Sequence, residues 1–460
     1  MPRRARRAAK AGGGRVRDLA FIGFLAALLG FGLRRPFLFV LAYAYVDIVA
    51  PQRLTYYLLN AVPLSLIVAA LALGGWILAD DKRGLRLAPR QALILLLLGW
   101  CWLTTGWAAF PIEAQDKWGW VWKALAFAAF LPFTLRTRLR MEALALFMTL
   151  SAASIIIVGG IKTLASGGGY GALNLMVDNN SGLYEGSTIS TVAIALIPLI
   201  LFLMRHGTIF APDWRVKLFG GALIFACLIL PVGTEARTGL VCIGVLALLM
   251  LRDVRRRAAY VAALGALALV ALPFLPQSFT QRMETIGSYR ADQSASTRLA
   301  VWRWTWDYAR AHPLGGGFDA YRANRIVVET ETKDGSRSVA MTPIVDKARA
   351  YHSAYFEMLG EQGWPGLGLW LAIQLGGLWR MGAIRRRYAP APPDLAWVRP
   401  FATALQNAQI IYMVGALFVA IAIQPFMLML TGLQIGLESW LARRDRQAAP
   451  RGFARRLAAA

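Results

Sequence analysis

Repeated apolar runs of about twenty residues are the feature that most constrains how this chain can fold. A helix needs about twenty mostly apolar residues to cross the hydrocarbon core of a bilayer. Runs of roughly this length occur at 187–204, 216–232 and 258–275. Hydrophobic residues make up 57% of the 460 positions and charged residues only 16%, whereas about a quarter of a soluble domain is charged. The sequence therefore predicts an all-α, polytopic membrane protein.

Short basic clusters separate the apolar runs and account for much of the formal net charge of +25. They are Arg3–Arg7, Lys82–Arg90, Arg136–Arg140, Arg252–Arg257, Arg385–Arg387 and Arg443–Arg446. Cytoplasmic loops of membrane proteins carry an excess of Lys and Arg. The clusters therefore indicate membrane orientation rather than nucleic-acid binding. The basic start of the chain is not expected to be a secretion signal, because no cleavage site follows its first apolar run.

Alternation of these clusters predicts about twelve transmembrane helices with both ends of the chain in the cytoplasm. Residues 18–51 are expected to form two short helices, broken at Arg34-Arg35-Pro36, that make one net crossing. The expected organisation has five parts: a basic cytoplasmic N-terminus (1–17), the first part of the transmembrane bundle (18–274), a large periplasmic loop containing helices (275–351), the last part of the bundle (352–442) and a basic cytoplasmic tail (443–460).

Two segments are predicted to face the outer compartment: the glycine-rich stretch Lys162–Glu185 and the loop 275–351. Loops of that length are usually functional rather than simple connections. The three cysteines, Cys101, Cys227 and Cys242, lie in apolar runs. Neither a disulfide nor a thiol nucleophile is therefore expected in the long loop.

Arg237 lies in Thr234–Gly239, at the predicted outer end of a membrane span. An arginine at that depth is costly unless it meets a partner or a polar cavity. Two interpretations fit: the side chain reaches for the membrane surface or pairs with Glu235, or its guanidinium binds phosphate through two parallel hydrogen bonds.

Within the long loop, Thr297 is expected to cap a helix that begins at Arg298. Trp302 and Trp306 would then share a helix face with Arg298, and Arg303 lies in the same segment. An aromatic stripe of this kind either anchors a helix at the membrane surface or forms a platform for a sugar. Arg298, near the helix N-terminus, would add to a positive field that attracts an anion.

His352 stands where the long loop gives way to an apolar helix. His312 is expected to be a turn residue, and His206 to lie in a cytoplasmic loop. A single histidine at a helix start can be purely structural, but its imidazole can also take a proton near neutral pH. The chain has neither an Asp-x-Asp nor a His-x-x-x-His motif, so metal ligation is not indicated. A base accompanied by arginines suits removal of a hydroxyl proton while a phosphate leaving group is stabilised.

At these motifs the chain resembles the O-antigen ligase and O-antigen polymerase superfamily. The residues that carry the resemblance are Thr234–Gly239, Thr297-Arg298 with Trp302, Pro313–Gly317, and His352-Ser353 with Tyr355, Glu361, Gly363 and Gly366. The order of these motifs around a large loop is more specific than any one of them. The N-terminal part, with Arg35-Pro36-Phe37 and Val46–Arg53, resembles exosortase-associated probable O-glycosylation ligases.

The resemblance implies a glycosyltransferase of the bacterial inner membrane with its active site facing the periplasm. It implies a glycan on undecaprenyl pyrophosphate as donor, a sugar hydroxyl of lipid A-core as acceptor, and no metal or other cofactor. By motif position, Arg237 and Arg298 would bind the donor pyrophosphate and His352 would be the catalytic base. Three further residues are expected to support this site: Tyr355, Arg303 and Glu235. Glu235 is a departure, because serine is common at that position, and it would either tether Arg237 or weaken its charge.

Other functions stay open on the sequence. The acceptor could be a protein or an exopolysaccharide, or the enzyme could be a polymerase that joins two lipid-linked repeats. A transporter of polyisoprenoid-linked glycans is an alternative from another class, and it predicts polar residues in the middle of several spans. The stretches 91–99, 192–204 and 240–251 are almost wholly apolar there. Membrane lipids are expected partners and nucleic acid is not.

Overall fold

The computed structural model describes residues 3–55, 62–166, 183–252, 256–271, 293–333 and 339–448. Three predicted segments lie partly outside them: the glycine-rich stretch (167–182), the end of the span 258–275 with the start of the long loop (272–292), and the tail (449–460). In chain order the elements are α1 (Arg3–Arg34), α2 (Phe37–Val49), α3 (Pro51–Leu54), α4 (Leu64–Ala79), α5 (Pro89–Thr105), α6 (Pro111–Thr134), α7 (Arg138–Ser166), α8 (Gly186–His206), α9 (Trp214–Gly233), α10 (Arg237–Leu251), α11 (Arg257–Ala271), α13 (Gln293–Ala311), η3 (Ala320–Ala323), β1 (Arg325–Lys333), β2 (Val339–Lys347), α14 (Ala354–Arg387), η4 (Pro393–Leu395), α15 (Val398–Gly415) and α16 (Pro425–Ala448).

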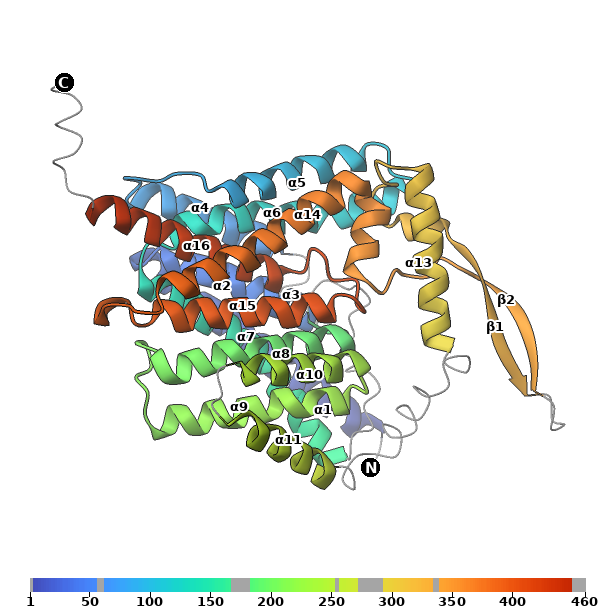
Figure 1. The fold of residues 1–460 in the computed structure, drawn as a ribbon, viewed down its shortest axis with the longest axis horizontal. Coiled ribbons are helices and arrows are strands. Elements are labelled where there is room, and N and C mark those ends of the chain that lie inside the picture. The colour runs from blue at the N-terminus through green and yellow to red at the C-terminus, as the bar shows by residue number, and fades with distance from the viewer. Residues whose placement is uncertain are drawn as a thin grey trace.

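Most helices run side by side in one bundle, and α13 lies across one end of it (Figure 1). Short sequence signals set where several helices begin. Pro89 and Pro111 stand at the first positions of α5 and α6, where the missing N–H costs nothing. The Glu185 carboxylate accepts from the Ser187 amide (3.0 Å) at the start of α8. Asp213 caps α9 in the same way, through the Val216 amide (2.8 Å).

The expected break at Arg34-Arg35-Pro36 is confirmed, since α1 ends at Arg34 and α2 begins at Phe37. The expected number of crossings is not. Among the described residues, four helices are long and apolar enough to cross a membrane: α7, α8, α9 and α14. Three shorter apolar helices are α2, α4 and α10. Several predicted spans do not meet that criterion among the described residues: α11 is described over 15 residues, and charged residues interrupt α6.

The antiparallel hairpin β1–β2 is the exception to the all-α prediction. It pairs Arg325 with Lys347 at its base and Lys333 with Val339 at its far end. Beyond α13, it projects away from the bundle (Figure 1). Residues 325–333 are rich in Ile, Val and Thr, which favour strands. That composition was the available signal, and the prediction of helices alone in the loop missed it.

A chain of buried polar side chains ties α5 to α14, α15 and α16. Arg90 bonds to Glu438 (3.0 Å) and Gln434 (2.8 Å). The Gln434 side-chain amide donates to the Gln409 side-chain oxygen (2.8 Å), and the Gln409 amide donates to the Gln374 side-chain oxygen (3.0 Å). The sequence placed Arg90 in a cytoplasmic basic cluster, but it is buried. Each of these buried polar groups is hydrogen-bonded, as stability in an apolar interior requires.

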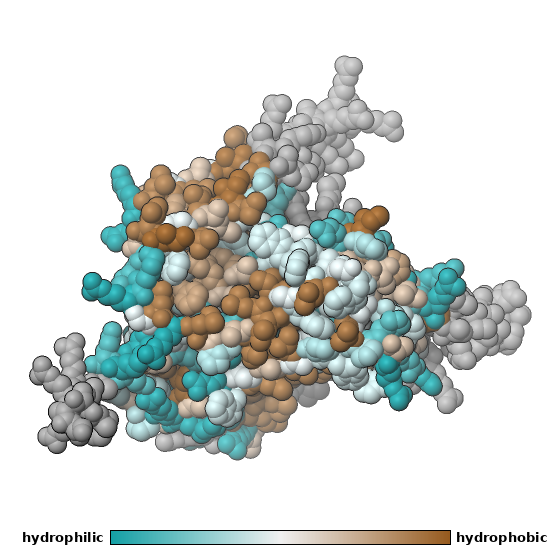
Figure 2. All heavy atoms as spheres, turned by 90° about the horizontal axis from the view of Figure 1, so that it is seen from above, coloured by the Kyte–Doolittle hydropathy of each residue, from teal (hydrophilic) through white to brown (hydrophobic). Residues whose placement is uncertain are grey.

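The surface of the bundle shows why it suits a membrane. Seen from above, an apolar area separates polar regions toward the two ends (Figure 2). Apolar side chains on α4 and α5 are strongly exposed, among them Leu78 at 88% and Trp102 at 63%. Three basic clusters meet at the end of the bundle away from α13, since Arg136 donates to the Arg83 carbonyl (2.8 Å) and Arg443 to the Leu135 carbonyl (3.4 Å). Apolar sides between polar ends are the pattern of a multi-pass membrane protein.

Candidate functional site

His352 occupies the turn that leads into α14, at the end of the bundle covered by α13. Its φ of 48° puts a non-glycine residue in the left-handed region, a conformation that surrounding contacts must hold. The contacts on either side do so: Trp302 Nε1 donates to the Tyr351 carbonyl (2.9 Å), and the Ala354 amide donates to the Ala416 carbonyl (2.8 Å). Tyr351 and Ser353 are buried, whereas His352 is exposed. The turn therefore presents the imidazole outward from a fixed backbone.

The charges around His352 come from three separate segments. Partial burial of the ring lowers the pKa of His352 below its ordinary value, and the positive charge of Arg298 lowers it further. Glu185 acts in the opposite direction, and Arg349 adds to the lowering. A histidine with a lowered pKa is neutral at physiological pH, so its free ring nitrogen can accept a proton. The predicted base and one predicted arginine thus lie within electrostatic reach of each other.

Arg237 is the first residue of α10 and is half-buried. Its segment packs against the start of α8, where the Thr234 and Ser190 hydroxyls bond (2.8 Å) and Gly186 lies close to Thr234. Glu185, which influences His352, caps that same helix. The N-termini of α8 and α10 therefore lie near the entrance to α14, and helix N-termini carry partial positive charge. Arg237, Arg298 and His352 all lie at this end of the molecule.

The residues expected to support the site have different positions. The Tyr355 hydroxyl donates to the Met413 carbonyl (3.1 Å) and its ring packs edge-on against Trp370, so it fastens α14 to α15. Arg303 is exposed on α13. Glu235 forms the turn between α9 and α10 with a φ of 50°. Of the three, Tyr355 has a clear structural task.

The loop helix differs from the prediction at its start. α13 begins at Gln293, so Thr297 lies inside it rather than capping it at Arg298. Trp302 stacks on Phe356 with 5.0 Å between ring centroids, and Trp306 meets Trp364 edge-on at 5.3 Å. The tryptophan stripe therefore packs α13 against α14, a role that neither sequence interpretation included. Trp302 is consequently a packing residue.

The glycine turn after α13 has a structural role, because it packs against the kink in α14. Gly316 and Gly317 donate to the carbonyls of Gly360 and Glu361 (3.0 and 2.9 Å), and Gly363 breaks α14 with a φ of 65°. An added Cβ at Gly363 would lie 2.3 Å from the Pro313 carbonyl oxygen. His312 stacks on Tyr308, one helical turn earlier in α13, consistent with a turn residue. This close fit fixes the position of the residues that follow the turn.

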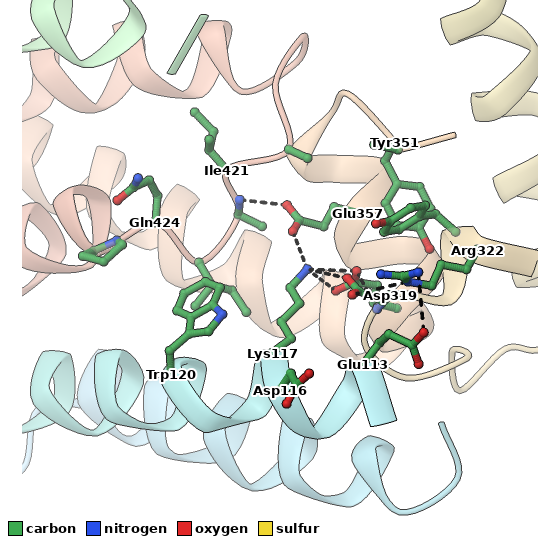
Figure 3. A pocket seen from close by; sticks show the side chains of 17 residues that line it. Glu113, Asp116, Lys117, Trp120, Asp319, Arg322, Tyr351, Glu357, Ile421 and Gln424 are labelled. Atoms are coloured by element: carbon green, nitrogen blue, oxygen red, sulfur yellow. Dashed lines mark hydrogen bonds and ion pairs between the residues drawn. The ribbon is translucent and has the colours of Figure 1, made fainter. Parts of the chain in front are cut away.

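Sequence reasoning missed a second polar site, on the other side of the start of α14. Lys117 of α6 is its centre, with Nζ 2.9 Å from carboxylate oxygens of both Glu357 and Glu361, and 3.9 Å from Asp319 (Figure 3). Arg322 lies 3.5 Å from Glu113 and 3.8 Å from Asp319. These groups line a cavity of about 400 Å³. The remaining lining residues are Asp116, Trp120, Tyr321, Ala350, Tyr351, Ala420, Ile421, Ala422, Ile423, Gln424 and Pro425.

The two glutamates that contact Lys117 accept further hydrogen bonds from backbone amides. The Asp319 amide donates to Glu361 (3.0 Å), and the Ala422 amide donates to Glu357 (3.1 Å). Burial raises the pKa of Asp319, while Lys117 and Arg322 oppose that rise. Glu357 and Glu361 are four residues apart and so share a helix face, which was the one signal in the sequence. Lys117 and Asp319 come from distant segments that only the fold brings together.

The fold and these two sites define a multi-pass, largely α-helical membrane protein with polar chemistry at one end. Residues 221–371 match a family model described as O-Antigen ligase. Residues 16–208 match a family of unknown function (DUF5935). Among proteins with curated descriptions, none matches this chain.

The O-Antigen ligase match supports the O-antigen ligase and polymerase superfamily for this chain, and with it a membrane enzyme of the glycan ligase or polymerase type. Arg237, Arg298 and His352 all lie inside the matched residues, whereas Lys117 lies outside them. The N-terminal resemblance to exosortase-associated ligases stays a prediction.

Proposed function

We propose that this protein is an inverting, metal-independent glycosyltransferase of the bacterial inner membrane, with its active site facing the periplasm. The donor is a glycan on undecaprenyl pyrophosphate, and the acceptor is a sugar hydroxyl of lipid A-core. One observation carries the proposal: inside the O-Antigen ligase match, the turn into α14 holds His352 with a pKa lowered by partial burial and by Arg298. A neutral base beside a fixed cation is what attack by a hydroxyl on a pyrophosphate-linked sugar requires.

In the proposed reaction His352 removes the proton of the acceptor hydroxyl as its oxygen attacks the anomeric carbon. The bond between that carbon and the pyrophosphate oxygen breaks, and undecaprenyl pyrophosphate leaves with the bonding electrons. Attack opposite the leaving group inverts the anomeric configuration. Arg237 and Arg298 stabilise the negative charge that develops on the pyrophosphate, because guanidinium groups bind phosphate oxygens in pairs.

The deciding experiment is reconstitution of the purified protein with undecaprenyl-pyrophosphate-linked glycan and a defined acceptor, without divalent metal. His352→Ala should lower transfer by about a hundredfold or more, the usual contribution of a general base, and should leave donor binding intact. His312→Ala is the matched control, because that ring stacks on Tyr308 in a turn. Near-normal transfer by His352→Ala would remove it as the base.

The arginines have a different expected signature. Arg237→Ala and Arg298→Ala should weaken donor binding as well as the rate, because each loses a contact to the pyrophosphate in both the ground state and the transition state. Arg310→Ala, exposed at the far end of α13, is the control. Unchanged donor binding and turnover in both variants would place the pyrophosphate elsewhere.

The same assay identifies the acceptor. Product on lipid A-core supports the proposed ligase, product on a second lipid-linked glycan indicates a polymerase, and product on a protein or exopolysaccharide indicates another ligase. A glycan that crosses the membrane of a sealed vesicle without transfer would indicate a transporter.

A further inference from the structure

The Tyr351 hydroxyl is buried in the wall of the Lys117 cavity and has no hydrogen-bond partner among the described residues. Its side chain is 1% exposed. Burial raises the pKa of the Tyr351 phenol well above its usual value, and Glu361 contributes to that rise, so the hydroxyl keeps its proton. A buried hydroxyl without a partner costs free energy, which a bound molecule with a polar atom would recover.

The charges in this cavity decide which molecules it can accept. Its lining residues include five carboxyl groups and two cations, Lys117 and Arg322. A phosphate or other anion would be repelled by this excess of carboxylates. The position between Glu357 and Glu361, where a small cation would be attracted, is already occupied by the Lys117 ammonium (Figure 3). The cavity therefore favours an uncharged polar molecule.

The remaining surface matches the chemistry of a sugar. A carboxylate offers about four acceptor sites, so Lys117 and Arg322 leave many carboxylate lone pairs available to hydroxyl donors. Asp116 adds an exposed carboxylate at the edge, and the indole of Trp120 lines the wall. Dense acceptors beside an aromatic face suit a group that carries several hydroxyls on an apolar ring.

The cavity and Arg237 flank the start of α14 from different sides. The cavity is built on α6 and η3, whereas Arg237 begins α10, and Figure 1 draws α15 between α6 and α10. Tyr351 lines the cavity and is bonded in sequence to His352. A sugar in the cavity would therefore reach the imidazole from the side opposite Arg237, and the attacking hydroxyl of an inverting reaction must lie opposite the leaving pyrophosphate.

We propose that the Lys117 cavity is a subsite for an uncharged sugar of the acceptor, recognised through the Tyr351 hydroxyl, the surrounding carboxylates and Trp120. This inference rests on the proposed function, because it takes the arginine side as the place of the donor pyrophosphate. The shared ligand chemistry is a sugar with free hydroxyls. It can be supplied by lipid A-core or by a second lipid-linked glycan.

The test is acceptor binding to protein in nanodiscs, measured in the His352→Ala background so that no turnover occurs. Tyr351→Phe should weaken binding of purified lipid A-core by on the order of fivefold, the loss of about one hydrogen bond. Binding of one equivalent of undecaprenyl-pyrophosphate glycan, the donor, should not change. Trp120→Leu should weaken acceptor binding in the same way.

Tyr43→Phe is the matched control, because the Tyr43 hydroxyl is also buried without a hydrogen-bond partner among the described residues but lies on α2, outside the cavity. Tyr351→Phe could bind lipid A-core normally but bind a second equivalent of lipid-linked glycan more weakly. The subsite then stands, and the acceptor sugar belongs to the second lipid-linked glycan. Weaker binding of the first equivalent, or no change with either acceptor, would overturn the subsite.

Failure of the proposed function and failure of the subsite give different combinations of transfer and binding results. If His352→Ala still transfers glycan while Tyr351→Phe still weakens acceptor binding, the base assignment falls and the subsite stands. If His352→Ala is inactive and Tyr351→Phe binds both acceptors normally, the base stands and the subsite falls.

Discussion

The two polar regions at the start of α14 use charge in opposite ways. On one side, Arg237 begins α10, and Arg298 of α13 lies close enough to an exposed histidine, His352, to lower its pKa, so this region carries positive charge. On the other side, Lys117 is enclosed by carboxylates that neutralise it within 2.9 Å. The first arrangement suits an incoming anion. The second joins α6 to α14 and leaves hydrogen-bond acceptors for an uncharged ligand.

The largest effect on stability is expected at Lys117. Lys117→Met should lower the free energy of unfolding by about 3–5 kcal/mol, because removing one partner leaves buried carboxylates without compensation. The side chains concerned are largely buried, with Lys117 16% and Glu361 2% exposed. The measurement is thermal unfolding in detergent, with Lys123→Met on the same helix as control. Equal melting of the two variants would show that the cluster contributes nothing to the fold.

A smaller loss is expected where the glycine turn meets α14. Gly363→Ala should destabilise the protein by about 1–3 kcal/mol, since a φ of 65° is strained for alanine and the new Cβ would clash with the Pro313 carbonyl. Gly368→Ala, in open space on the same helix, should be neutral or slightly stabilising. The same unfolding assay compares them, and a neutral Gly363→Ala would mean that the break is not fixed by this contact.

The charges around His352 should change the pH dependence of glycan transfer. Arg298 lowers the pKa of His352, so Arg298→Ala should raise that pKa and move the low-pH loss of activity to higher pH. Glu185 raises the pKa of His352, so Glu185→Gln should move the loss to lower pH. Rate profiles from pH 5 to 8 test both signs. Shifts in the same direction would show that His352 does not titrate as the base.

The smallest effect is expected at Tyr355. Tyr355→Phe removes the hydrogen bond to the Met413 carbonyl and should lower stability by about 1 kcal/mol. Transfer and the KM for both substrates should be unchanged, because the ring packs against Trp370 rather than facing either polar region. A selective rise in one KM would return Tyr355 to the binding site.

Local patterns in the sequence located much of the bundle and one of its two polar regions. The apolar runs 187–204 and 216–232 predicted α8 and α9 within a few residues, and the acidic caps Glu185 and Asp213 stand at their starts. Predictions from local patterns failed where the structure depends on strand pairing or on where a helix begins and ends. It missed the β1–β2 hairpin, and it expected a helix start at Arg298 that lies at Gln293. Its count of about twelve membrane spans stays unconfirmed, since four helices among the described residues are long and apolar enough to cross a membrane.

By itself, the sequence determined the membrane class, the orientation signals and the order of the motifs that contain Arg237, Arg298 and His352. These depend on composition and on neighbours along the chain, which a reader of the sequence can see. Only the tertiary structure decided that Lys117, Asp319 and Glu361 would meet, and that Arg90 would be buried among glutamines. Burying a charge costs free energy unless the charge is paired. The partners of these buried charges come from segments hundreds of residues away in the sequence.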